Sequence, residues 1–116
     1  MGDCLMSTLK YNTWLNTDNT ENYKCRAWVN FNGTGTVAIR ASGNVSSITD
    51  NGTADYTVNF TNALPDANYS YNATATINTN AGQAVSAPST TALRIGLERS
   101  DGAAVDTSYV TVSIFR

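Results

Sequence analysis

The acidic side chains are the first candidates for chemistry, because the chain contains no histidine. Without histidine it lacks the commonest general base and the usual zinc ligand. Residues 50–55 (DNGTAD) contain part of a calcium-loop pattern, but not the alternating carboxylates and later glutamate of an EF-hand. Only Glu21 and Glu98 are glutamates, and most acids fall in predicted turns, so no carboxylate pair suits glycoside hydrolysis. We therefore expect no enzyme activity, no metal and no cofactor.

Binding chemistry has more candidates. Tyr69 and Tyr71 alternate along a predicted strand and share one face, where they either stack on a sugar or pack in the core. Two predicted loops, residues 79–83 and 100–103, carry hydrogen-bonding side chains. The candidate ligand-facing residues are Tyr69, Tyr71, Asn80, Gln83 and Asp101. Four other aromatic residues are interpreted as core or cross-strand packing: Trp28, Phe31, Tyr56 and Phe60.

The first 23 residues differ from the rest, because large apolar side chains flank a polar run at residues 16–22. The candidate subunit or shell contacts are Leu9, Tyr11, Trp14, Leu15 and Tyr23. Large apolar side chains such as these are normally buried against another part of the chain or against a partner. Two interpretations remain open: an extra edge strand of the domain's own sheet, or an arm that docks on a neighbouring chain.

Composition narrows the class of protein. A chain of 116 residues is expected to form one domain. Its net charge is −2 and its seven basic residues are spread out, so we expect no nucleic-acid binding. No apolar run approaches the roughly 20 residues that cross a bilayer, so we expect no membrane insertion. The N-terminus lacks the pattern of a signal peptide, so nothing points to secretion. Cys4 and Cys25 are expected to be free thiols, which fits synthesis in a reducing cytosol.

The secondary-structure elements that position these candidate residues are predicted to be β-strands. Polar and apolar residues alternate over residues 55–60, 69–77, 93–97 and 110–114. Turn residues separate such stretches, as in Asn32-Gly33 and Asp101-Gly102. This pattern predicts an all-β fold, an antiparallel β-sandwich of jelly-roll or Ig-like type with about seven strands. We assign residues 24–116 to the sandwich and residues 1–23 to the N-terminal arm or edge strand.

One long stretch carries a family resemblance. It comprises residues 25–40 (CRAWVNFNGTGTVAIR) and continues through residues 44–53, 55–60 and 64–69. The stretch closely resembles a small module of tailed-bacteriophage virion proteins, especially tail-fibre-like proteins of marine and cyanobacterial phages. The match covers about residues 24–70, and the C-terminal half is similar only in its pattern of strands. Residues 6–10 (MSTLK) also resemble the usual opening of such proteins, so residues 1–5 are expected to be an upstream extension.

The resemblance implies a non-enzymatic virion protein made in the host cytoplasm and often trimeric, with other virion proteins as partners. Our first hypothesis is a tail-fibre or receptor-binding domain whose loops face a host surface glycan or protein. The alternative is a capsid decoration (cement) protein whose N-terminal arm docks on the shell, which the short chain and its aromatic arm favour. A third class is a carbohydrate-binding module of a larger enzyme.

Overall fold

Eight β-strands and no helix make up the fold of the described residues. The computed structural model describes residues 8, 10–76, 82–99 and 101–116, and for residues 82–86 it describes the backbone alone. The strands are β1 (Cys25–Asn32), β2 (Ala38–Gly43), β3 (Val45–Gly52), β4 (Asp55–Phe60), β5 (Ser70–Ala75), β6 (Gly82–Pro88), β7 (Ala92–Glu98) and β8 (Val110–Phe115).

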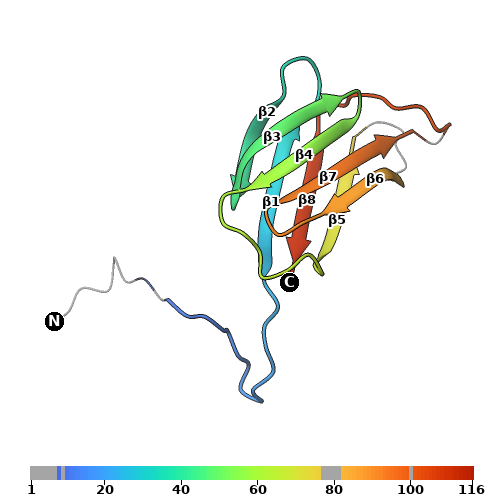
Figure 1. The fold of residues 1–116 in the computed structure, drawn as a ribbon. Helices are drawn as coiled ribbons and strands as arrows, with labels where there is room; N and C mark the ends of the chain where they lie inside the picture. The colour runs from blue at the N-terminus through green and yellow to red at the C-terminus, as the bar shows by residue number, and fades with distance from the viewer. Residues whose placement is uncertain (1–7, 9, 77–81, 100) are drawn as a thin grey trace.

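The strands form two antiparallel sheets that pack face to face (Figure 1). The first sheet has the order β2-β1-β8-β5, and the second has the order β3-β4-β7-β6. Each sheet therefore has a central pair, β1–β8 or β4–β7, that joins distant parts of the chain. The predicted all-β antiparallel sandwich is confirmed.

Alternation along the strands creates the core between the sheets. In β1 the inward residues are Ala27, Val29 and Phe31, and in β8 they are Val110, Val112 and Ile114. The second sheet supplies Tyr56, Val58, Leu93, Ile95 and Leu97. Phe31 meets Tyr56 edge to face at a centroid distance of 5.1 Å, which joins the two layers. Burial of each valine, leucine, isoleucine or phenylalanine side chain in this set stabilises the fold by about 1.5–3 kcal/mol.

The strand absent from the sequence-based prediction is β6. Its small residues alternate weakly, and Gly82 and Pro88 at its ends are typical of loops. Among the described strands it pairs only with β7, so it lies at the edge of this sheet, where proline is tolerated. The prediction that Gln83 lies in a loop is wrong, because its backbone pairs with Leu97.

A buried polar network fastens the end of the sandwich at which the β1–β2 hairpin lies. The Tyr56 hydroxyl lies 2.8 Å from both the Gly33 carbonyl oxygen and Asp106 Oδ1. The Ala54 N–H also donates to Asp106 Oδ1, at 2.7 Å. Burial, and then the hydrogen bond to Asp106, raise the pKa of the Tyr56 hydroxyl far above its ordinary value, so it remains a donor. This network ties the β1–β2 hairpin and the β3–β4 turn to the β7–β8 connection.

Residues 10–24, which we call the N-terminal segment, belong to none of the eight strands and run away from the sandwich (Figure 1). The segment folds back on itself, with a bridge between Leu15 and Glu21 and a hydrogen bond of 2.7 Å from the Asn22 N–H to the Trp14 oxygen. The radius of gyration is 16.8 Å, against about 13 Å for a compact domain of this length. The described part of the segment therefore does not act as an edge strand of either sheet.

Candidate functional site

The two outer faces of the sandwich differ in how their polar side chains are paired. On the second sheet, Asn59 Nδ2 donates to Ser47 Oγ at 3.1 Å and to Thr49 Oγ1 at 2.9 Å. On the same face Arg94 forms a two-point ion pair with Asp55, with distances of 2.9 and 2.6 Å. These amide and charged groups bond to one another, which leaves few donors or acceptors for a ligand.

The outer face of the first sheet also has bonded pairs, Thr74 with Thr111 and Arg40 with Asn30, but beside them it carries exposed aromatic side chains and unpaired polar groups. Trp28 on β1 and Phe115 on β8 are each 43% exposed. Trp28 lies opposite Ser113, which in turn lies opposite Asn72 on β5. Among the described residues, no hydrogen-bond partner is found for the side chains of Asn72 and Ser113. This face can therefore offer stacking surfaces and hydrogen bonds at the same place.

Gly43 holds the Trp28 indole in position. The two residues pair across β1 and β2, and the indole lies against the Gly43 backbone. A Cβ atom added at Gly43 would lie only 2.8 Å from Trp28 Cδ1, closer than carbon atoms approach without displacement. A side chain on Gly43 would therefore lift the indole away from the sheet.

A hollow of about 250 Å³ continues this face at the end near the N-terminal segment. Its lining residues are Tyr23, Asn68, Ser70, Phe115 and Arg116. Ser70 and Phe115 pair across β5 and β8, so they belong to both the face and the hollow. We call the residues Trp28, Ser70, Asn72, Ser113 and Phe115 the aromatic platform.

An ion pair between Asp66 and Arg116 borders this hollow, with Arg116 Nη2 lying 2.8 Å from Asp66 Oδ2. The hydrogen bond from Arg116, and then that from the Asn68 N–H, lower the pKa of the Asp66 carboxyl to about 2.

The Asp66 ion pair makes stability depend on acid pH. In the unfolded chain the pKa of an aspartate is about 3.9. The ion pair therefore contributes its full stabilisation of the folded state above that pH, and this stabilisation is lost as pH falls toward about 2. We expect the thermal midpoint to fall over this range, and less steeply in Asp66→Asn. An NMR titration of the carboxyl checks the pKa, and Arg116→Gln should move it toward the ordinary value. A wild-type carboxyl that titrates near 3.9 would contradict the assignment.

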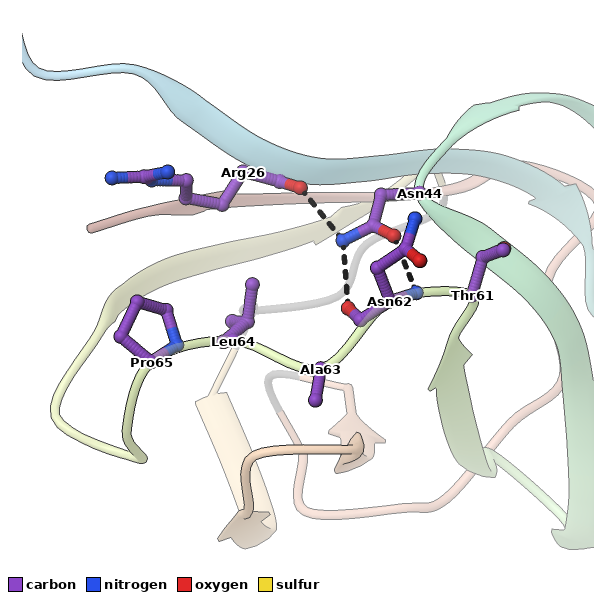
Figure 2. A pocket seen from close by; sticks show the side chains of 7 residues that line it. All are labelled: Arg26, Asn44, Thr61, Asn62, Ala63, Leu64 and Pro65. Atoms are coloured by element: carbon purple, nitrogen blue, oxygen red, sulfur yellow. Dashed lines mark hydrogen bonds between the residues drawn. The ribbon is translucent and has the colours of Figure 1, made fainter. Parts of the chain in front are cut away.

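A larger pocket of about 550 Å³ lies between β1 and the loop after β4 (Figure 2). Its lining residues are Arg26, Asn44, Thr61, Asn62, Ala63, Leu64 and Pro65. Asn44, with a φ of 55°, donates its amide to the carbonyl oxygens of Arg26 and Asn62 at 3.0 and 3.1 Å. Its Oδ1 accepts from the Asn62 N–H at 2.8 Å. Asn44 thus fixes the corner at which the chain crosses between sheets, and the lining contains no acid–base pair.

Tyr69 and Tyr71 lie on one face of the chain, but that face is the inner one. Tyr69 is 7% exposed, and its hydroxyl donates to the carbonyl oxygen of Ser89 at 3.1 Å or of Ala92 at 3.2 Å. Burial raises the pKa of the Tyr69 hydroxyl. Tyr71 is half-buried and packs against the core, with its ring 6.2 Å from that of Tyr69. The prediction that these two tyrosines face a receptor is therefore wrong.

The other candidate ligand-facing residues are not gathered into one site. Asp101 is exposed in a turn of the β7–β8 connection and accepts a hydrogen bond of 3.0 Å from the Ala103 N–H. This connection lies at the end of the sandwich opposite the N-terminal segment (Figure 1). Gln83 lies on the edge strand β6. Asn80 lies outside the described residues.

The predicted contact residues of the N-terminal segment are open to solvent. Tyr23 is 79% exposed, and Tyr11, Trp14 and Leu15 are each about half exposed. The Tyr11 and Trp14 rings meet edge to face at 5.8 Å. Leu9 lies outside the described residues. The segment therefore presents apolar side chains that no strand of its own sandwich covers.

Trp28 was assigned to packing from the sequence, although alternation carried a signal for its exposure. It lies three positions before Phe31, and an odd offset along a strand places two residues on opposite faces. Phe31, Tyr56 and Phe60 are buried as predicted, whereas Trp28 lies on the outer face over Gly43.

Among the described residues, no group of three or more Cys, Asp or Glu side chains is placed to hold a metal ion. That part of the chain also contains no helix long and apolar enough to cross a membrane. A comparison with protein-family models, curated proteins and solved structures found no match.

Proposed function

We propose that this protein is a non-enzymatic structural protein of a phage virion, a tail-fibre or receptor-binding domain that acts as a homotrimer. The observation that carries this proposal is the aromatic platform, an open face on an otherwise closed and self-paired sandwich. A rigid sheet that exposes Trp28 and Phe115 beside unpaired amide and hydroxyl groups suits surface recognition rather than catalysis. The sequence resemblance of residues 24–70 to phage virion modules supports the same class.

The N-terminal segment supports assembly. Its exposed Tyr11, Trp14 and Leu15 would be covered if each segment docked on the next copy of the chain. Such a contact joins two different surfaces, and rotation by one third of a turn closes it into a ring of three. Each segment then stabilises its neighbour through burial of these side chains.

Two measurements test the proposal. Light scattering of the purified chain should give the mass of three copies, and quantitative mass spectrometry of purified particles should find a few copies per hundred major capsid proteins. The double variant Trp14→Ser/Leu15→Ser should remain folded but become monomeric, whereas the neighbouring change Thr13→Ser should leave the trimer intact. A wild-type monomer, or particles that lack the chain, would overturn the proposal.

A capsid decoration protein is the second candidate, and the N-terminal segment favours it. In this case the exposed apolar side chains of the segment dock on the capsid shell rather than on another copy. The particle count separates the two candidates, because a decoration protein should approach one copy per major capsid protein.

A further inference from the structure

We propose that the aromatic platform binds a neutral oligosaccharide, with the Trp28 indole stacked on one pyranose ring and Phe115 on a second ring along the same glycan. This inference names the ligand class of the receptor-binding function proposed above and rests on that function for its biological setting. Its structural support comes from the outer face of the first sheet alone.

The stacking surface is preformed. Because the indole lies against Gly43, one of its faces is supported by backbone while its side chain remains 43% exposed. A side chain that is fixed before binding loses little conformational freedom when a ligand docks. A pyranose ring has a face of C–H groups that packs on such a flat aromatic surface.

Phe115, the second stacking group, lies on the same face as Trp28, where a further sugar ring of the glycan would be. Phe115 is two residues beyond Ser113, the cross-strand partner of Trp28, so the two aromatic side chains are diagonal neighbours on one face. Such positions are about 7–8 Å apart in an antiparallel pair, within reach of aromatic side chains. The hollow lined by Tyr23, Asn68 and Ser70 extends this binding surface beyond Phe115.

Polar groups are available where sugar hydroxyls would lie. Asn72 and Ser113 form one row with Trp28, and Ser70 pairs with Phe115 in the next. An amide offers two donors and an acceptor, and each hydroxyl offers one donor and two lone pairs. These side chains have no partner among the described residues, whereas Asn59 on the opposite sheet is bonded to Ser47 and Thr49.

The charge of the platform selects a neutral ligand. None of its five residues is charged, and no carboxylate of the described strands points from this face. Three arginines border it, and each makes a contact: Arg40 lies 3.8 Å over the Tyr109 ring, Arg116 is paired with Asp66, and Arg26 donates its Nε to the Arg116 carbonyl oxygen at 2.8 Å. A protein partner fits less well, because three of the five platform residues, Asn72, Ser70 and Ser113, are polar, whereas the core of a protein interface is usually apolar.

Binding is tested on the full chain with an array of neutral and acidic glycans, followed by calorimetry with cellotetraose, chitotetraose and mannotetraose. We expect binding to at least one neutral glycan, with NMR shift changes confined to β1, β8 and β5. Trp28→Ala should weaken binding at least tenfold, whereas Asn59→Ala, a change on the outer face of the opposite sheet, should leave it unchanged. Asn72→Ala keeps both aromatic groups and should weaken binding by several fold.

Several results would overturn the inference. They are no binding on the array, binding to acidic glycans only, or binding that Trp28→Ala leaves unchanged in a folded variant. Loss of the trimer in Trp28→Ala would assign the platform to an interface between copies instead. If the chain is found in particles but binds no glycan, this inference alone is overturned. If the chain binds a glycan but is absent from particles, the proposed virion function alone is overturned.

Discussion

Replacement of Phe31 by alanine is expected to lower the free energy of unfolding by about 3–5 kcal/mol, the usual cost of removing a buried phenylalanine ring. Phe31 has no exposed surface, and its ring contacts that of Tyr56 between the two sheets. Since a domain of this size is stabilised by only about 5–15 kcal/mol, this loss is a large fraction of the total and should lower the urea midpoint clearly. Urea denaturation followed by circular dichroism measures the change.

The matched control is Phe115→Ala, the same chemical change on the outer face of the same sheet. Because Phe115 is already 43% exposed, this change should cost less than half as much. Equal losses in the two variants would mean that Phe31 does not bridge the layers as described.

Gly33→Ala is expected to destabilise the protein by about 3 kcal/mol, at the upper end of the usual range for overpacking. A Cβ atom at Gly33 would lie 2.5 Å from the Tyr56 hydroxyl and 2.9 Å from the Thr107 carbonyl oxygen. Neither atom can move easily, because the hydroxyl is bonded to Asp106 and the carbonyl accepts from the Gly33 N–H at 2.9 Å. The substitution should therefore open the network that closes this end of the sandwich.

Gly35→Ala in the same hairpin separates this steric effect from backbone strain. No atom lies within 4 Å of a Cβ at Gly35, but its φ of +58° makes alanine unfavourable by roughly 1–2 kcal/mol. In a Tyr56→Phe background the penalty of Gly33→Ala should shrink, because one of the close contacts has gone. If the penalty were the same in both backgrounds, the Tyr56 hydroxyl would not be the group that excludes a side chain.

The sequence predicted those parts of the fold in which local pattern and tertiary structure agree. Residues 55–60 alternate without interruption, and they form β4 with Tyr56, Val58 and Phe60 inward. Residues 110–114 behave in the same way in β8. In β6 the pattern is weak, because its sequence GQAVSAP contains only one large apolar residue, so alternation gives little signal.

The platform was harder to predict, because it depends on which face of each strand meets the other sheet. Alternation places Tyr69 with Tyr71 and separates Trp28 from Phe31, but it does not say which set is outside. The pairing of Trp28 with Gly43 and Ser113 depends on register between strands far apart in sequence. No local pattern encodes that register.

The central place of β8 has a consequence for synthesis on the ribosome. Both β1 and β5 pair with β8, which is the last strand along the chain, so the first sheet cannot close until residues 110–115 have been made. A nascent chain that ends earlier exposes the edges of β1 and β5 and the apolar faces of both layers, which favours aggregation. The first sheet therefore closes only after β8 has left the ribosome, and a chain terminated before β8 is distinguished from a longer one by its failure to fold.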